Sequence, residues 1–211
     1  MDNPFFKNNG PFKIYDILKI LNLDTNQFPE KQNIFDIKDL LTYSETDITF
    51  LHSKKYKEIA KNTKASFCIT TETLKEDLPK NCIPLIVKNV LVATSLITAN
   101  FYPDSIYDNF DNTVEQNNIN NFKEKVKFGK NVLIGENVTF GNNCFVGHNT
   151  IIEKNVIIGD NCSIGSNNII RNSFIKDNVK ILDNCVIGKH GFGFFPNNNK
   201  NLRYPHIGFV L

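Results

Sequence analysis

The stretch IGENVTFGNNCFVGHNTIIEKNVIIGDNCSIG, from Ile134 to Gly165, places an apolar residue at every sixth position. Glycine commonly follows that residue, and asparagine stands three places after it. An α-helix would repeat its apolar face every three to four residues, and a half-buried β-strand would alternate every two. A sustained six-residue period is instead typical of a parallel β-helix, in which short strands stack about 4.8 Å apart.

The six-residue period continues on both sides of this stretch. It is interrupted once, by a five-residue step from Ile170 to Ile175. We expect the apolar residue of each repeat to face the interior of the coil. These residues are Phe122, Phe128, Ile134, Phe140, Val146, Ile152, Ile158, Ile164, Ile170, Ile175, Ile181 and Ile187.

Two other positions of the repeat have their own composition. The residue four places after each apolar residue is mostly small or β-branched, which suits a narrow interior; Cys144, Cys162, Phe174 and Cys185 occupy this position. Asparagine adopts a positive φ more readily than most residues, and glycine does so freely, so both are expected to turn the chain between strands. The asparagines of the repeat are Asn131, Asn137, Asn143, Asn149, Asn155, Asn161, Asn167, Asn178 and Asn184.

The residues before the repeats have the pattern of alternating helices and strands. Apolar residues between Ile14 and Leu21 recur at the spacing of one helix face. Runs of β-favouring residues at 47–51 and 65–70 flank a helical segment for which Ser53 is a suitable N-cap. Another strand follows, and then a helix over 90–102.

The sequence therefore predicts two domains of different fold class. We expect a small α/β domain at 1–102, a linker rich in Asp and Asn at 103–121, and a parallel β-helix at 122–211. Residues 191–205 cannot be divided into six-residue repeats, and they predict a loop inserted into the β-helix. The sequence ends within a repeat and without a capping unit, so we expect the β-helix to be truncated at Leu211.

Charge and composition argue against several classes of function. The 24 Lys and Arg residues against 22 Asp and Glu residues give a net charge of +2, too little for a nucleic-acid-binding surface. The longest apolar run, at 82–101, contains Lys88 and two asparagines, so no membrane span is predicted. The five cysteines form no CxxC pair. Disulfides and a zinc cluster are therefore not indicated, and a cytoplasmic location is expected.

Three stretches together carry a resemblance to a known family. They are FFKNNGPFKIYDI near the N-terminus, DITFLHSKKY at Asp47–Tyr56 and GFGFFPNNNKNLRYPHIG at Gly191–Gly208. With a small α/β domain ahead of hexapeptide repeats, the chain resembles the UDP-3-O-acylglucosamine N-acyltransferases of lipid A biosynthesis. The glycine-aromatic stretch is more specific than the hexapeptides, which many acyl- and nucleotidyltransferases share.

The resemblance implies a left-handed β-helix, a homotrimer, and active sites in clefts between neighbouring subunits. It also implies transfer of a 3-hydroxyacyl chain from acyl carrier protein to the 2-amine of UDP-3-O-acyl-glucosamine. This reaction needs a general base for the amine and hydrogen-bond donors for the developing oxyanion. No metal, no other cofactor and no covalent enzyme intermediate is expected.

The resemblance assigns uridine binding to three residues of the α/β domain. In this family an aromatic pair sandwiches the uracil, and here that pair is Phe50 and Tyr56; stacking on a base contributes about 1–3 kcal/mol. Ser53 stands where the family usually has asparagine, and a hydroxyl makes fewer hydrogen bonds to uracil than an amide. The residues alone allow another interpretation, in which the two rings belong to the core and Ser53 only caps a helix.

None of the four histidines is assigned as the general base. His52 follows the uridine motif as an exposed loop residue, and His148 lies in a solvated turn. His190 occupies an asparagine position of the repeat, where histidine also tolerates a positive φ, and His206 lies in a turn where the repeats resume. In the family the catalytic histidine belongs to a later coil. We therefore expect it beyond Leu211 and expect the 211 residues alone to be inactive.

The inserted loop contains more aromatic residues than a solvated loop needs. Phe192 and Phe194, with Phe195, are expected to contact either the acyl chain of the acceptor substrate or the neighbouring subunit, and both alternatives stay open. Phe192 and Phe194 are therefore candidate substrate-binding residues.

Three rival functions have different requirements. Another UDP-sugar acyltransferase with hexapeptide repeats is one rival, but the O-acyltransferase of the same pathway begins its repeats near its first residue and has no α/β domain in front. A γ-type carbonic anhydrase would need three histidines on adjacent coils, and His148 has no histidine one coil away. A non-catalytic β-helical scaffold would leave Phe50, Tyr56 and the glycine-aromatic stretch unexplained.

Overall fold

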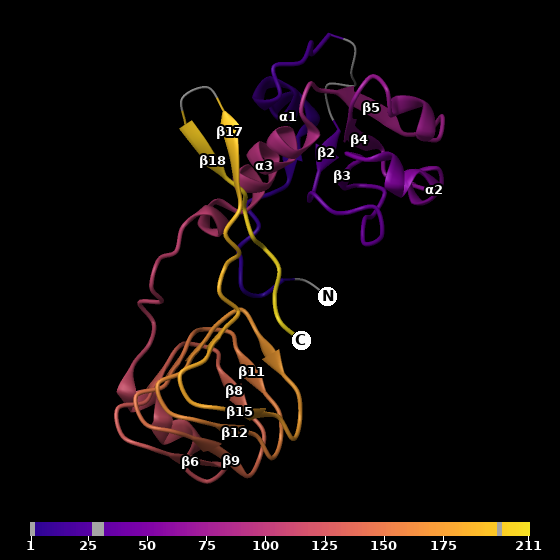
Figure 1. Ribbon diagram of the computed structural model, residues 1–211. Coiled ribbons are helices and arrows are strands. Elements are labelled where there is room, and N and C mark those ends of the chain that lie inside the picture. The colour runs from indigo at the N-terminus through magenta and orange to yellow at the C-terminus, as the bar shows by residue number, and fades with distance from the viewer. Residues whose placement is uncertain (1–2, 27–31, 198–199) are drawn as a thin grey trace. The chain divides into compact units, whose positions relative to one another are not determined.

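The computed structural model describes residues 3–26, 32–197 and 200–211, and the chain divides into two compact units. The coil unit contains Met1–Phe5, Tyr107–Gly191 and His206–Leu211, and the front unit contains Phe6–Ile106 and Phe192–Pro205. Figure 1 shows both units coloured along the chain. Each unit has its own set of fully buried apolar side chains.

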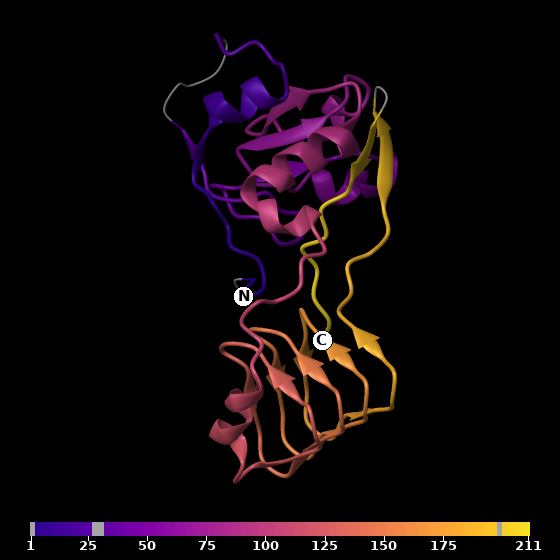
Figure 2. The same cartoon turned by 90° about the vertical axis from the view of Figure 1, so that its left-hand side faces the viewer.

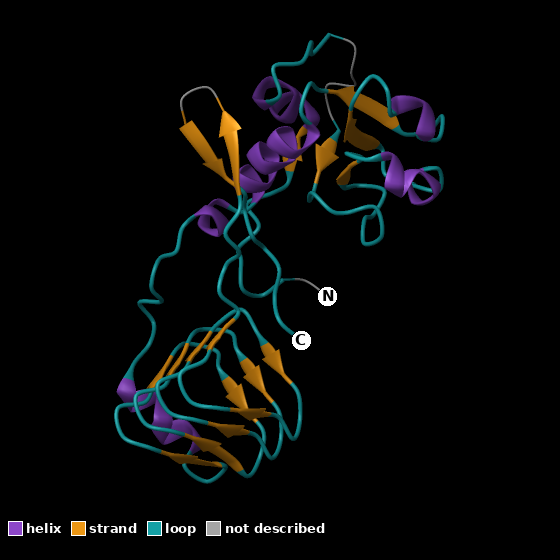
Figure 3. Cartoon of the chain, viewed as in Figure 1, coloured by secondary structure: helices purple, strands orange, loops and turns teal. Residues whose placement is uncertain are grey.

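The coil unit is a parallel β-helix with three faces. Its strands are two or three residues long, and strands of successive coils pair in parallel to form three sheets (Figures 1 and 3). The first sheet has the order β16-β13-β10-β7, the second β14-β11-β8 and the third β15-β12-β9-β6. The strands are β6 (Val126–Phe128), β7 (Leu133–Ile134), β8 (Thr139–Phe140), β9 (Cys144–Val146), β10 (Ile151–Ile152), β11 (Ile157–Ile158), β12 (Ser163–Ile164), β13 (Ile169–Ile170), β14 (Phe174–Ile175), β15 (Lys180–Ile181) and β16 (Val186–Ile187).

The pairing register confirms the six-residue period. Ile152 pairs with Ile134 on one side and with Ile170 on the other, so each coil consists of three repeats. The five-residue step from Ile170 to Ile175 does not shift the pairing register, because Ile175 still pairs with Ile158. These five isoleucines are buried, so the interior of the coil is a column of stacked apolar side chains.

Asparagine turns the chain at the corners of the coil, as the sequence predicts. All nine asparagines of the repeat have a positive φ, between 55° and 62°. Their side chains also stack between coils: the Asn131 amide donates to Asn149 Oδ1 at 3.1 Å, and the Asn149 amide donates to Asn167 Oδ1 at 3.2 Å. The asparagine therefore stabilises both the turn and the stacking of one coil on the next.

The repeat glycines have a different role from the predicted one. Within the described residues only Gly188 among the glycines has a positive φ, of 74°, so the prediction of turn-forming glycines was wrong at the other repeats. Glycine is needed there because the next coil lies too close for a side chain. A Cβ on Gly147 would lie 2.5 Å from the carbonyl carbon of Gly165 and 2.5 Å from Ser166 N. Such distances are far inside van der Waals contact.

The shortened repeat changes which side chain faces the interior. Ser173, not Phe174, fills the narrow interior position and is fully buried, so the prediction for Phe174 was wrong. Phe174 pairs with Ile157 on the outer side of the second sheet. Its ring packs against those of Phe5 and Phe209, with centroids 5.1 Å away in both cases.

The last described coil departs from the repeat in two places. His190 lacks the positive φ that its position predicts, because the chain has already turned at Gly188. Cys185 is half-buried, whereas Cys144 and Cys162 lie in the interior as predicted. All five cysteines are free thiols.

Residues 108–115 form a strap along one corner of the coil unit. Asp111 Oδ2 accepts a hydrogen bond from Lys154 N at 2.7 Å, and Thr113 Oγ1 accepts one from Glu136 N at 3.0 Å. At the other two corners, a side chain of the next coil accepts the equivalent backbone hydrogen bond. The strap thus supplies acceptors that the coils do not supply at this corner. The 3₁₀-helix η4 (Gln116–Phe122) follows the strap and leads into β6.

The front unit is a small α/β domain built on a three-stranded parallel sheet. The sheet has the order β3 (Ile48–Phe50), β4 (Phe67–Thr70), β5 (Ile83–Ile86), and β1 (Phe12–Lys13) pairs antiparallel with β2 (Asn33–Ile34). The helices are α1 (Ile14–Ile20), α2 (Lys57–Ala60), α3 (Val90–Phe101), η1 (Lys54–Tyr56), η2 (Lys75–Asp77) and η3 (Pro103–Ile106). Helix α3 lies against β4 and α1. No helix within the described residues is long and apolar enough to cross a membrane.

The residues expected to form an inserted loop include an antiparallel hairpin, which belongs to the front unit. It consists of β17 (Phe194–Asn197) and β18 (Lys200–Arg203) and appears as two adjacent arrows in Figure 2. Ser95 Oγ on α3 donates to Arg203 O at 3.3 Å, and Arg203 Nη1 donates to Ile106 O at 3.4 Å. These bonds attach the hairpin to α3 and η3.

Candidate functional site

The carboxyl end of β3 positions the predicted uridine-binding residues. Phe50 is the last residue of this strand, and the next residue, Leu51, is held by β4. Leu51 N donates to Ile69 O at 2.9 Å, and Leu51 O accepts from Thr70 Oγ1 at 3.1 Å. Ligands of parallel α/β sheets commonly bind beyond the carboxyl ends of the strands. The loop after Phe50 is therefore fixed and lies where a ligand is expected.

Ser53 caps the helical turn that contains Tyr56. Its Oγ accepts a hydrogen bond from Lys55 N at 3.3 Å, and Tyr56 N donates to Ser53 O at 3.1 Å. The capping role considered for Ser53 is therefore present. A hydroxyl that accepts this bond still has its own proton to donate, so capping leaves Ser53 able to hydrogen-bond a ligand carbonyl.

Three aromatic side chains stand in sequence around this loop, and we call Phe50, His52 and Tyr56 the aromatic row. The Phe50 and His52 ring centroids lie 6.1 Å apart with an interplanar angle of 31°, and those of His52 and Tyr56 lie 5.2 Å apart with an angle of 47°. Phe50 and Tyr56 are half-buried and His52 is exposed. Tyr56 rests on an apolar cluster that contains Leu51 and Cys68. The aromatic row is therefore supported from below by buried apolar side chains and presents part of its ring surface to solvent.

Three lysines lie next to the aromatic row in the sequence. Lys55 Nζ lies 5.9 Å from the centroid of the Tyr56 ring, and Lys54 is a further exposed cation of the same turn. Lys57 pairs with Asp77 Oδ1 at 3.0 Å, and this hydrogen bond raises the pKa of Lys57. Positive charge beside a base-stacking surface suits a nucleotide, whose phosphates are anionic.

The aromatic pair of the hairpin lies elsewhere on the front unit. The Phe192 side chain is 93% exposed and Phe194 is 43% exposed, and their ring centroids lie 4.8 Å apart. On the described residues no ring contact joins this pair to the aromatic row. Phe195 packs on Tyr204 instead, at 5.5 Å, and burial raises the pKa of Tyr204. The pair thus offers an exposed apolar surface, and both of its predicted contacts stay predictions.

Two of the other histidines have local partners in the coil unit. His148 Nδ1 accepts a hydrogen bond from Lys130 N at 2.8 Å. His148 therefore lies in an exposed turn, as predicted, and also links two successive coils at that corner. His190 Nδ1 lies 3.6 Å from Asp108 Oδ1, and Lys189 Nζ lies 2.9 Å from Asp108 Oδ2. Neither arrangement is that of a general base beside an exposed substrate site.

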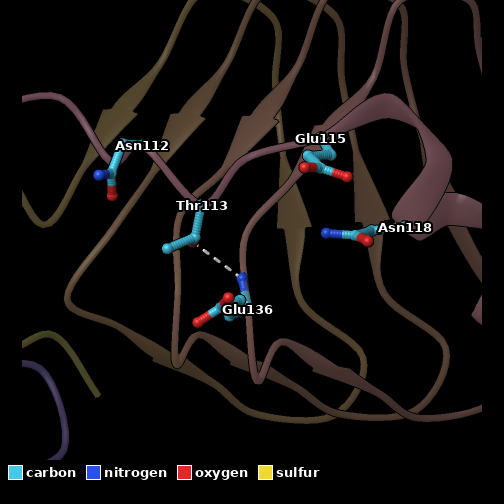
Figure 4. Close-up of a pocket in the computed structure, with 5 residues that line it drawn as sticks. All are labelled: Asn112, Thr113, Glu115, Asn118 and Glu136. Atoms are coloured by element: carbon cyan, nitrogen blue, oxygen red, sulfur yellow. Dashed lines mark hydrogen bonds between the residues drawn. The ribbon is translucent and has the colours of Figure 1, made fainter.

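A polar pocket lies between the strap and the first coil, lined mainly by a segment that the sequence predicts only as a linker. Figure 4 shows its lining, which consists of Asn112, Thr113, Glu115, Asn118 and Glu136. Two carboxylates and two amides face this space, and the Glu136 backbone nitrogen is bound by Thr113. No set of three His, Cys, Asp or Glu side chains is arranged as metal ligands within the described ranges.

The front unit also contains a partly buried polar cluster that the sequence did not predict. The Tyr102 hydroxyl bonds to Asp36 at 2.7 Å from Oδ1 and 2.8 Å from Oδ2, and Asn8 Nδ2 donates to the Tyr102 oxygen at 3.4 Å. Burial raises the pKa of Asp36, although the hydrogen bond from Tyr102 acts in the opposite direction. Burial also raises the pKa of Tyr102, and the neighbouring Asp36 adds to that effect. The only sequence signal was the Asn8 segment within the motif near the N-terminus.

Comparison with known proteins gives two family matches. Residues 32–99, which include Phe50, Ser53 and Tyr56, match the family described as UDP-3-O-(3-hydroxymyristoyl) glucosamine N-acyltransferase. Residues 137–172 match the bacterial transferase hexapeptide of six repeats. Phe192 and Phe194 lie outside both matched segments.

Individual relatives agree with the first of these matches. The UDP-3-O-acylglucosamine N-acyltransferases of Rickettsia prowazekii (strain Madrid E) and Rickettsia typhi (strain ATCC VR-144 / Wilmington) are each 35% identical to this chain over 100 residues. These alignments cover 46% of the chain and 29% of each relative. The enzyme of Rickettsia bellii (strain RML369-C) is 32% identical over 104 residues, which cover 48% of the chain and 30% of the relative.

The chain resembles the UDP-3-O-acylglucosamine N-acyltransferases. The resemblance first seen in its sequence motifs is thereby confirmed. The hexapeptide match and the stacked parallel sheets also confirm the fold class, a small α/β domain followed by a left-handed parallel β-helix. Each alignment spans less than a third of the relative's own length.

Proposed function

We propose that this chain carries the uridine-binding part of an N-acyltransferase of lipid A biosynthesis. The proposed enzyme moves a 3-hydroxyacyl chain from acyl carrier protein to the 2-amine of UDP-3-O-acyl-glucosamine. The observation that carries the proposal is the aromatic row at the carboxyl end of β3, within the segment that matches the N-acyltransferase family. A cytoplasmic location belongs to the same proposal.

The proposed roles of the site residues follow from their surroundings. Phe50 and Tyr56 stack on the two faces of the uracil, and each contact contributes about 1–3 kcal/mol. Ser53 donates a hydrogen bond to a uracil carbonyl while it continues to cap its helical turn. Lys54 and Lys55 attract the diphosphate that follows the nucleoside.

The chemical step needs groups in addition to this site. The 2-amine of the sugar attacks the carbonyl carbon of the acyl thioester, the C–N bond forms, and the thiolate of the carrier protein leaves. A general base takes the proton of the attacking amine, and hydrogen-bond donors stabilise the oxyanion. None of the residues described above is assigned to these two roles.

A homotrimer is the proposed assembly, and one surface of the coil unit supports it. The outward positions of the first sheet are all apolar, and they pair in register across four coils. They are Leu133, Ile151, Ile169 and Val186, of which Val186 is 54% exposed. The outward positions of the third sheet include Lys127, Ser163 and Lys180 instead. An apolar row of this kind is suited to burial against another chain.

Nucleotide titration tests the proposed function. Phe50→Ala and Tyr56→Ala should each weaken binding of UMP and UDP-GlcNAc to the intact chain by about 5- to 150-fold, because each removes one stacking surface. Tyr15→Ala is the matched control, since Tyr15 is a partly exposed tyrosine on α1, outside the site. Isothermal titration calorimetry with UMP, and with AMP for base preference, gives the affinities. Absence of measurable UMP binding to the wild-type chain would contradict the proposal and favour a non-catalytic scaffold.

A further inference from the structure

We propose that the imidazole of His52 occupies the uracil position in the unliganded protein and must rotate away before the base can stack. His52 then determines how tightly the site holds a uridine nucleotide. This inference rests on the proposed uridine site and adds to it a residue to which neither the resemblance nor the comparisons assign a role.

The His52 ring contacts both of the rings that are proposed to hold the base. Its centroid lies 5.2 Å from Tyr56 and 6.1 Å from Phe50, within the range of about 4.5–7 Å over which aromatic rings make offset contacts. A base sandwiched by Phe50 and Tyr56 needs contacts with the same two rings. The imidazole and the uracil therefore compete for the same surfaces.

The imidazole is free to leave, because only ring contacts hold it. No hydrogen bond or ion pair to His52 occurs within the described residues, and the side chain is exposed. The backbone on either side is fixed, since Leu51 is bonded to β4 and Ser53 caps the next turn. Opening the site thus requires rotation of one side chain and no change of the loop, a motion on the picosecond to nanosecond scale.

The relative strengths of the contacts decide the outcome of this competition. On each of the two rings, the contact of an aromatic side chain is weaker than the stacking of a base, so a uridine nucleotide can displace the imidazole. The imidazole therefore lowers affinity without closing the site. Its removal should tighten UMP binding by about two- to tenfold, the equilibrium equivalent of the closer of the two ring contacts, that with Tyr56.

The test compares wild-type chain, His52→Ala and His148→Ala in UMP titrations. His148→Ala is the matched control, because it removes an exposed histidine in the coil unit, outside the aromatic row. We expect His52→Ala to bind UMP two- to tenfold more tightly than wild type and His148→Ala to bind it equally. Unchanged affinity in His52→Ala would overturn the inference. Weaker binding would overturn it as well, since His52 would then be a contact of the ligand.

A second measurement follows the imidazole directly. Nuclear Overhauser effects between the His52 and Tyr56 rings should be present in the free wild-type chain and disappear when UMP saturates the site. Effects that persist in the complex, or that are missing in the free chain, would show that the imidazole does not occupy the base position. If neither wild type nor His52→Ala binds UMP, the proposed uridine site itself fails. Binding of equal strength in both refutes only the role of His52.

Discussion

At the scale of single residues, the coil depends on glycine for space and on asparagine for direction. Both residue types are tolerant of a positive φ, but the structure divides the two tasks between them. Asparagine supplies the turn at the nine repeat positions given above, and glycine allows the next coil to approach. The two positions therefore tolerate different substitutions.

Gly147→Ala should lower the free energy of unfolding by about 1–3 kcal/mol, as expected for an added methyl group in a packed site. The new Cβ would meet the backbone of Gly165 and Ser166 at 2.5 Å. Gly208→Ala is the control, because no heavy atom lies within 4 Å of the Cβ built there. Urea unfolding gives both values. Equal stability of the two variants would contradict the role assigned to the glycines.

At the scale of elements, the polar cluster at the end of α3 joins three parts of the front unit. Tyr102 follows α3 directly, Asp36 follows β2, and Asn8 belongs to the segment before β1. The Tyr102 hydroxyl is the centre of this cluster, with bonds to both of the others. Its loss should therefore loosen the attachment of α3 to the strands.

Tyr102→Phe should destabilise the protein, and the loss should grow with pH. The hydroxyl stabilises the Asp36 carboxylate, and a hydrogen bond to a charged group contributes about 1.5–3 kcal/mol. Burial holds the pKa of Asp36 above its ordinary value, so the folded state binds this proton more tightly than the unfolded state does. Stability therefore falls as pH rises from the ordinary pKa of an aspartate through the higher pKa of folded Asp36. In Tyr102→Phe it falls further, because the hydroxyl no longer lowers the pKa of Asp36.

Urea unfolding at pH 4 and pH 7 measures this effect. The difference between wild type and Tyr102→Phe should be larger at pH 7 than at pH 4, because the raised pKa of Asp36 means that lower pH favours its protonated form, which the hydroxyl stabilises less. Tyr107→Phe, at an exposed tyrosine of the coil unit, serves as the control and should show no pH-dependent difference. A Tyr102→Phe loss of equal size at both pH values would refute the coupling to Asp36.

At the scale of the whole molecule, the apolar row on the first sheet is the proposed interface of the homotrimer. Ile169→Lys places a charge in the middle of that row, between Ile151 and Val186. We expect wild type to sediment as a trimer and Ile169→Lys to sediment as a monomer. Ser163→Lys, on the outward side of the third sheet, should remain trimeric. A monomeric wild type, or an Ile169→Lys trimer, would show that this row is not the interface.

The sequence predicted the parts of this molecule that repeat or that follow a simple period. The interior isoleucines, the nine asparagine turns and the strand and helix near Ser53 were all predicted correctly. What it did not predict depends on contacts between distant residues. The hydrogen bond from Lys154 N to Asp111 and the place of Ser173 in the interior both arise only when coils are stacked.

In the candidate site, too, the sequence predicted the local pattern but not the side-chain contacts. Its residue types and spacing were visible in the segment from Phe50 to Tyr56, because the loop is short and local. The contacts of the His52 ring with both candidate stacking partners were not predicted, since they depend on side-chain rotamers on the fixed backbone of Leu51 and Ser53.

Chemical-shift mapping with UMP tests the central claim most directly. Amide resonances of the isotope-labelled intact chain are followed as UMP is added. We predict that the largest shifts occur at residues 50–57 and that the resonances of β6 to β16 stay unchanged. Shifts centred on the coils, or a spectrum that UMP leaves unaltered, would contradict the claim that the front unit binds uridine.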